Sequence, residues 1–300
     1  MKAKILAHLA LFVVALFYGG NYLIAKGLMP DLIGPSGFII LRVTGAGLLF
    51  WILYLFNWEK IASSDVPRLM LCGMAGVAAN QLLFFNGLNA TSPVNASIIM
   101  TSNPVLVLLA SAVILKTRIT GRKILGIALG ASGAILLLLL SRNAISQNVS
   151  WQGDLMVFLN AMAYGVYLVM VKPLMSKYKP LTVIAWVFLF GWIVVLPFGW
   201  SQASAIDWSL FTPRHFWGVA YVVIGTTFLV YLLNIFALKT VMPTVVSVYI
   251  YLQPLLAATF AFIYAYYGGA DYTGDITLGR VACALMIFVG VYLTSVSRKG

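Results

Sequence analysis

Charged residues are scarce in this 300-residue sequence, and acidic residues are the scarcest. Lys and Arg number 19, Asp and Glu only 7, and together they make up 9% of the chain, whereas soluble domains carry roughly 25% charged residues. With 62% hydrophobic residues and a mean hydropathy of +0.99, there is too little polar surface to cover a soluble globule. The composition excludes a soluble domain and predicts a membrane protein.

Cysteine and histidine are also nearly absent, at two residues each. Cys72 and Cys283 lie in apolar stretches and are interpreted as small buried side chains, which excludes a disulfide scaffold. The sequence has no zinc-spaced Cys and His set, Walker A sequence, dinucleotide fingerprint or nucleophile elbow. We therefore expect no catalytic residues, no metal and no cofactor, and we do not expect an enzyme.

Long apolar segments occupy nearly the whole chain. A helix that crosses a bilayer needs roughly 20 mostly apolar residues. Ten such segments are found: 5–25, 35–56, 68–88, 93–115, 122–141, 154–172, 180–200, 215–237, 243–266 and 277–296. The predicted fold class is an all-α integral membrane protein with ten transmembrane helices, and the expected partner of its surface is the lipid bilayer.

The cations are distributed unevenly between the two ends of these segments. Fourteen lie on one side, Lys26, Arg142, Arg214 and Arg280 lie on the other, and Arg42 lies within a segment. Because Lys and Arg concentrate in cytoplasmic loops, we expect a multi-pass protein with both termini in the cytoplasm. The same rule explains the net charge of +12, so no nucleic-acid partner is expected.

The two halves of the sequence resemble each other at fixed offsets. At an offset of 146, the Tyr, Gly, Lys, Leu and Met of residues 18–29 recur, and at an offset of 150 the segment before Pro104 recurs before Pro254. Each half holds five predicted segments, an odd number, so the second copy enters the membrane from the opposite face. The sequence predicts two inverted repeats, 1–142 and 143–300, an arrangement that supports alternating access.

Pro104 and Pro254 stand near the middle of the fourth and ninth segments, and each follows a carboxamide, Asn103 or Gln253. A proline inside a helix removes a backbone donor and obstructs a carbonyl. At membrane depth, such a break is tolerated where it is buried in protein or faces a water-filled cavity. A kink that only shapes packing is the alternative, but the paired prolines favour helices that line a cavity.

Arg42 lies about seven residues inside the second segment, where insertion of a charge costs roughly 2.5 to 3.5 kcal/mol. The acids all lie at the ends of the segments, so its partner must be a carbonyl, water, a loop acid such as Asp31, or an anionic ligand. Two interpretations stay open: Arg42 contacts substrate, or it bonds backbone at the outer interface. The lack of embedded acids also favours uniport or exchange over proton coupling.

Further polar and aromatic residues fall at the depth expected of a central cavity. The predicted substrate-binding residues are Arg42, Tyr18, Asn21, Asn80, Gln81, Asn103, Tyr164, Tyr231, Tyr249 and Gln253. Other polar residues at this depth are Asn160, Thr226, Thr227 and Asn234. Separately, Gly126, Gly130 and Gly133 form a small-residue face on the fifth segment, which predicts close helix packing within a monomer or at a homodimer seam.

Together these motifs resemble bacterial members of the drug/metabolite transporter superfamily of the EamA type, and the likeness spans residues 5–296. That family has an aromatic-Gly-x-Asn run, similar to Tyr18 through Asn21, an Arg early in the second helix, similar to Arg42, and a mid-helix proline in each repeat. The second half departs from the pattern because its seventh segment has no counterpart of Arg42.

The resemblance implies a permease in the bacterial cytoplasmic membrane that carries amino acids, other metabolites or drugs, often outward, through a central cavity between the halves. Relatives that exchange sugar phosphates or nucleotide sugars use several cations in the cavity. Here Arg42 alone lies deep, which favours a neutral or zwitterionic small molecule, with exchange of phosphorylated metabolites as the alternative. A receptor or a lipid-acting enzyme is the alternative from another class.

Overall fold

Helices form all the regular structure in the described part of the chain. The computed structural model describes residues 2–116, 121–142, 150–269 and 277–295. Within these ranges it contains helices and no strand, as expected of a chain in lipid, where each segment must satisfy its own backbone hydrogen bonds. The predicted boundary after residue 142 borders a stretch outside the described residues, and so does the predicted end of the last segment.

The helices follow the apolar segments closely. The first half contains α1 (Lys2–Leu28), α2 (Pro35–Phe56), η1 (Ser63–Asp65), α3 (Val66–Gly73), η2 (Met74–Ala79), α4 (Asn80–Ala90), α5 (Pro93–Met100), α6 (Asn103–Ile114) and α7 (Gly121–Arg142). The second half contains α8 (Trp151–Val171), η3 (Lys172–Ser176), α9 (Pro180–Ser204), η4 (Trp208–Leu210), α10 (Pro213–Ala220), η5 (Tyr221–Leu229), α11 (Val230–Thr240), α12 (Pro243–Val248), η6 (Tyr249–Tyr251), α13 (Leu252–Tyr266) and α14 (Leu278–Ser295). Several begin with proline, whose missing N–H has no helical partner at that position.

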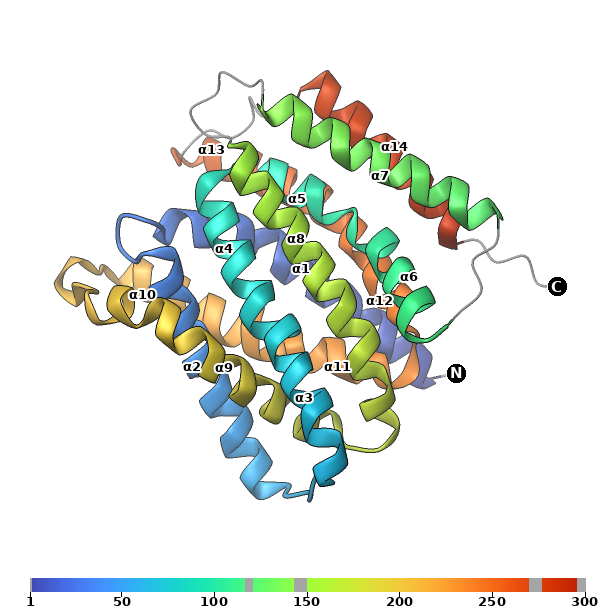
Figure 1. Ribbon diagram of the computed structural model, residues 1–300. Coiled ribbons are helices and arrows are strands. Elements are labelled where there is room, and N and C mark those ends of the chain that lie inside the picture. Colours follow the sequence, from blue (N-terminus) through green and yellow to red (C-terminus); the bar gives the residue numbers. More distant parts are fainter. Residues whose placement is uncertain (1, 117–120, 143–149, 270–276, 296–300) are drawn as a thin grey trace.

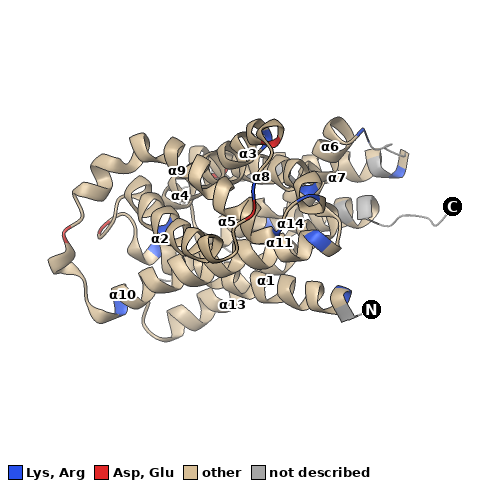
Figure 2. Ribbon diagram, turned by 90° about the horizontal axis from the view of Figure 1, so that it is seen from below, with Lys and Arg blue, Asp and Glu red and all other residues tan. Residues whose placement is uncertain are grey.

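Within the described residues, eight helical stretches are long and apolar enough to cross a membrane. They are Ala3–Leu28, Pro35–Phe56, Ser63–Ala90, Pro93–Ile114, Trp151–Ser176, Pro180–Ser204, Pro213–Thr240 and Pro243–Tyr266. The fifth and tenth predicted segments fall on α7 and α14, whose apolar parts among the described residues, Ile124–Gly133 and Leu278–Gly290, are shorter. Charged residues gather mainly at helix ends and loops and leave long uncharged stretches between them (Figure 2).

Helices of the first half pair with helices of the second. α2 lies against α9, α4 against α8, and α1 against α11 and α13. α7 and α14 lie side by side at one edge of the molecule (Figure 1). Large apolar side chains such as Phe56, Phe198 and Leu255 are exposed on the outside of the bundle, so lipid is the natural environment of these surfaces.

The small-residue face predicted on the fifth segment packs against α14 of the same chain. A Cβ atom on Gly290 would lie 2.6 Å from both the Gly126 carbonyl oxygen and the Gly130 nitrogen. A Cβ atom on Gly133 would lie 3.0 Å from the carbonyl oxygen of Cys283. Such close backbone approach requires glycine. The face is therefore occupied within the chain.

A candidate substrate site in a central cavity

A cavity lined by both polar and apolar side chains lies where the two halves meet. The cavity volume is about 50 Å³, several times the roughly 10 to 15 Å³ that one water molecule needs. Its lining residues are Tyr18, Asn21, Tyr22, Arg42, Asn80, Gln81, Phe84, Phe85, Met100, Asn160, Tyr164, Tyr231, Ile250 and Gln253. They come from α1, α2, α4 and α5 of the first half and from α8, α11, η6 and α13 of the second.

The cavity gathers eight of the ten predicted substrate-binding residues. Those eight are Tyr18, Asn21, Arg42, Asn80, Gln81, Tyr164, Tyr231 and Gln253. Tyr249 lines a smaller adjoining space, and its hydroxyl lies 2.8 Å from Nδ1 of His8. Asn103 is not part of the lining: it is fully buried, and its Nδ2 donates to the Ala161 carbonyl at 2.6 Å, which ties α6 to α8.

Arg42 presents a buried guanidinium to the cavity. It is 3% exposed, and its Nε and Nη2 donate to Oγ1 of Thr227 at 2.9 and 2.8 Å. Its Cζ lies 4.2 Å from the centre of the Phe85 ring, a cation–π contact. An arginine has five N–H donors, so donors remain, and no carboxylate contacts it within the described residues. Asp31, considered as a partner from the sequence, is exposed in the turn after α1.

A chain of amide and hydroxyl groups runs along the same cavity. The Tyr231 hydroxyl lies 2.9 Å from the Gly76 carbonyl and 3.2 Å from Oδ1 of Asn80. It accepts from Nε2 of Gln81 at 3.4 Å. Nδ2 of Asn160 donates to the backbone carbonyl of Asn80 at 2.5 Å. These contacts link α4 and η2 of the first half to α8 and α11 of the second.

Two π-helical segments precede this network, and the sequence analysis did not predict them. η2 leads directly into Asn80, and η5 leads into the helix that carries Tyr231. In η5, the hydroxyls of Thr226 and Thr227 both donate to the Val222 carbonyl, at 3.0 and 2.7 Å. Such π segments shift helix register and occur often at functional sites. Here η5 carries Thr227, whose hydroxyl holds Arg42.

The fourth and ninth segments are each interrupted beside the cavity. α5 ends at Met100 and α6 begins at Asn103, one residue before Pro104. α12 ends at Val248, and after η6 the helix α13 begins two residues before Pro254. Each proline therefore lies in the first turn of a new helix, where proline is tolerated. The interruptions bring Met100, Ile250 and Gln253 to the cavity wall.

Sequence reasoning omitted the apolar wall, which consists of Tyr22, Phe84, Phe85, Met100 and Ile250. In a sequence with 18 Phe and 15 Tyr, no pattern separates these side chains from core residues. Tyr22 also has a polar role, because its hydroxyl donates to Oε1 of Gln253 at 2.6 Å. The sequence did contain a signal for Tyr22: it lies one turn after Tyr18 in α1, so both side chains share one face of the helix.

Lys26 and Lys172, which correspond at the offset of 146, bind helix C-termini at the borders of the bundle. Their Nζ atoms donate to backbone carbonyls, those of Leu88, Asn89 and Thr91 for Lys26, and those of Leu238 and Val241 for Lys172. Carbonyls at a helix C-terminus carry partial negative charge. Each ammonium therefore secures a turn that precedes a helix-starting proline.

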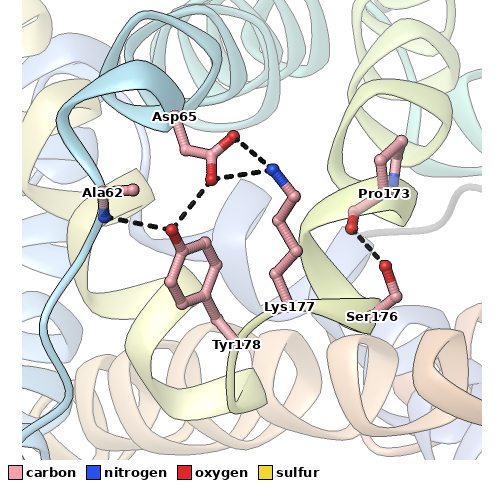
Figure 3. A network of polar contacts seen from close by, with 6 residues as sticks. All are labelled: Ala62, Asp65, Pro173, Ser176, Lys177 and Tyr178. Atoms are coloured by element: carbon pink, nitrogen blue, oxygen red, sulfur yellow. Dashed lines mark hydrogen bonds and ion pairs between the residues drawn. The ribbon is translucent and has the colours of Figure 1, made fainter.

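A separate polar network joins the two halves through their loops (Figure 3). Nζ of Lys177 lies 3.0 Å from both carboxylate oxygens of Asp65, and the Tyr178 hydroxyl donates to Oδ2 of Asp65 at 2.8 Å. The same hydroxyl accepts from the Ala62 N–H at 3.1 Å. At the other ends of α2 and α9, Oε1 of Gln202 accepts from the N–H groups of residues 36 and 37.

The chain belongs to the EamA-like transporter family, whose model matches residues 5–139 and 151–296. This match confirms the resemblance drawn from the sequence. An uncharacterized transporter of Archaeoglobus fulgidus is 27% identical over 290 residues, which cover 96% of each chain. The transporter YyaM of Bacillus subtilis is 24% identical over 298 residues, 96% of this chain and 94% of that one. The protein is thus a multi-pass membrane transporter, and both of these relatives are named as transporters.

One relative is named by its cargo, and one solved structure shares the fold. A probable terminal-alkyne amino-acid exporter of Streptantibioticus cattleyicolor is 32% identical over 165 residues, 55% of this chain and 54% of that one. A crystal structure aligns with a TM-score of 0.64 at 17% identity and covers 96% of both chains. At that identity the structure supports the fold alone.

Proposed function

We propose that this protein is a secondary transporter built from ten transmembrane helices in two inverted repeats, 1–142 and 143–300. The helix contacts support the repeat, in which α1 corresponds to α8, α2 to α9, α4 to α11 and α7 to α14. The contact of α1 with α11 then corresponds to the contact of α8 with α4. The contacts of α2 with α9 and of α7 with α14 each join two helices that correspond to each other. Gly45 approaches Val223, and Gly191 approaches Val77. These two contacts also correspond, because Gly191 lies 146 residues after Gly45 and Val223 lies 146 residues after Val77. Such a pair of repeats exposes one central site to each side in turn.

The cargo we propose is a small amino acid or related amphipathic metabolite, carried outward across the cytoplasmic membrane of a bacterium, with both termini in the cytoplasm. The observation that carries this proposal is Arg42, a buried cation on the cavity with unused donors and no carboxylate partner within the described residues. A substrate carboxylate would supply the missing charge. The name of the Streptantibioticus relative agrees with this cargo.

Transport requires the halves to separate on one side. A space of about 50 Å³ holds a few water molecules but not an amino acid in the geometry described. Substrate would therefore enter as the helices that line the cavity move apart, as alternating access demands. Tyr18 and Tyr164, at matching positions of the two halves, line both the cavity and the adjoining space toward Tyr249 and are placed to act as a gate.

Flux into sealed vesicles tests the function directly. Purified protein in liposomes preloaded with unlabelled amino acids should accumulate the labelled amino acid by exchange, while sugar phosphates and nucleotide sugars should not compete. Uptake of phosphate esters alone would replace the amino-acid cargo with a phosphorylated one, and the absence of any flux would favour a receptor. Labelling of single cysteines added at each terminus in intact cells tests the topology, and labelling of one terminus from outside would contradict it.

A further inference from the structure

We propose that the cavity contains a second subsite, for an ammonium group, formed by Oε1 of Gln81 and Oδ1 of Asn160. With Arg42 as the carboxylate subsite, the substrate class becomes the zwitterionic α-amino acids with an apolar side chain. This inference rests on the proposed function of the same cavity.

The two oxygen atoms are buried acceptors that no described residue satisfies. Gln81 and Asn160 are each 1% exposed and line the cavity, and Oε1 and Oδ1 have no hydrogen-bond partner. A buried polar atom left unpaired is unfavourable, because it has lost its hydrogen bonds to water without replacement. Two such acceptors beside one cavity therefore favour a ligand that brings donors.

The orientation of both amides is fixed by the groups around them. Nδ2 of Asn160 donates to a backbone carbonyl, which can only accept. Nε2 of Gln81 donates to the Tyr231 hydroxyl. That hydroxyl in turn donates to the Gly76 carbonyl at 2.9 Å. Each nitrogen uses one of its two N–H groups, whereas neither oxygen has a hydrogen-bond partner among the described residues. The oxygens are therefore the groups that most need a partner from a ligand. An ammonium carries three donors and no acceptor, so it matches these oxygens.

The spacing of the two subsites fits an α-amino acid, whose charged groups share one carbon atom. Arg42 lies on the ring of Phe85, and Gln81 lies one helical turn before Phe85 in α4. Thr227, which holds Arg42, likewise lies one turn before Tyr231, which holds Gln81. One turn rises about 5.4 Å, so a carboxylate and an ammonium on one carbon atom would reach both sets of groups once the helices that line the cavity move apart.

The rest of the lining selects the remaining part of the substrate. Tyr22, Phe84, Met100 and Ile250 present mainly apolar surface, which suits an apolar side chain. The oxygens of a phosphate ester would lie beside the oxygens of Gln81 and Asn160, and two acceptors cannot hydrogen-bond to each other. The loss of water from both sets of oxygens would then go uncompensated. The same oxygens that attract an ammonium thus disfavour a second anionic group.

Competition on the wild-type protein gives the first test. In liposomes, exchange of tritiated leucine would be inhibited with leucine, with 4-methylpentanoate, which lacks the amino group, and with isopentylamine, which lacks the carboxylate. Leucine should inhibit at concentrations about 10- to 100-fold lower than either analogue, because hydrogen bonds to charged groups contribute about 1.5 to 3 kcal/mol. Equal inhibition by leucine and 4-methylpentanoate would overturn the ammonium subsite and leave the transport proposal intact. If neither leucine nor the carboxylate is bound, the proposed function itself fails.

Isosteric variants locate the subsite. Gln81→Met and Asn160→Leu should lose most of the preference for leucine over 4-methylpentanoate while they keep inhibition by the carboxylate. Asn86→Leu is the matched control, since Asn86 is a partly buried amide of α4 that does not line the cavity. An unchanged preference in both variants, or an equal weakening of both ligands, would overturn the assignment. Should either variant fail to fold, the wild-type competition decides.

Discussion

The two halves of this transporter place different chemistry at positions that correspond in the proposed repeat. At the offset of 146, Arg42 in α2 corresponds to Phe188 in α9. Arg42 brings a cation and donors, whereas the Phe188 ring packs edge-on against Phe50 and Tyr231, with ring centres 4.9 Å apart in each pair. A ligand with one carboxylate needs one guanidinium, and at this pair of positions only the first half supplies a cation.

The asymmetry extends to the helix segment that holds Arg42. Pro67 and Pro213 correspond at an offset of 146, but Leu88 and Leu238 correspond at 150. The second half therefore contains four more residues in this stretch, about one helical turn. The π segment is nine residues long there and six in the first half. Thr227 lies in this longer segment, so the insertion supplies the hydroxyl that orients the guanidinium.

Removing the charge from one half should have the largest effect. Arg42→Gln deletes the cation and is expected to weaken transport of a carboxylate substrate by about 10- to 150-fold, as the loss of one or two charge-assisted hydrogen bonds implies. Phe188→Leu, the change at the corresponding position, keeps an apolar side chain and should alter transport by less than about threefold. Initial rates of exchange, normalised to the amount of folded protein in the vesicles, give the comparison.

A purely structural arginine would behave differently. In that case Arg42→Gln would reduce folded protein and transport in proportion, and Arg42→Lys would restore neither. Comparable losses in the Arg42 and Phe188 variants would contradict the division of roles between the halves. If Arg42→Gln leaves the binding of an uncharged amphipathic solute unchanged, the charge of Arg42 acts on the substrate carboxylate alone.

An intermediate effect is expected when the guanidinium keeps its charge but loses its support. Thr227→Val removes the acceptor of both Arg42 hydrogen bonds without a large change in volume. Leaving charged donors unpaired costs about 1 to 3 kcal/mol, so transport should fall about tenfold, mainly through a higher KM. Thr259→Val is the control, because Thr259 bonds the Leu255 carbonyl at an exposed position of α13. A larger loss in the control, or none in Thr227→Val, would remove Thr227 from the site.

Hydropathy predicted the apolar helices of this molecule, but not the details of the site. The apolar segments could be predicted because hydropathy follows membrane position, and eight of the ten predicted substrate-binding residues line the cavity. The π segments could not, since their register depends on contacts such as the bond from Tyr231 to the Gly76 carbonyl. Asn103 was assigned to the substrate from its place beside a proline, yet its amide donates to α8, and only tertiary packing determines that direction.

The two lysines that bind helix C-termini allow a comparison of the opposite ends of the bundle. The turn held by Lys26 also bears Thr91 and Asn95, whose side chains donate to the buried Asp154 carboxylate at 2.5 and 2.6 Å. At the offset of 150 the corresponding residues are Val241 and Val245. The first turn is thus fixed by side chains and by its lysine, whereas the second has apolar side chains at these two positions.

The smallest effect should appear in stability when each lysine is replaced by methionine, which keeps the apolar stem. Lys26→Met leaves three described carbonyls without the ammonium and Lys172→Met leaves two, so the first should cost about 1 kcal/mol more. That difference corresponds to a Tm about 2 to 4 °C lower, measurable by thermal unfolding in detergent. Lys239→Met, at an exposed position of α11, should change the Tm little. A larger loss for Lys172→Met would reverse the order, and would indicate that the end of the bundle with fewer side-chain contacts depends most on its single cation.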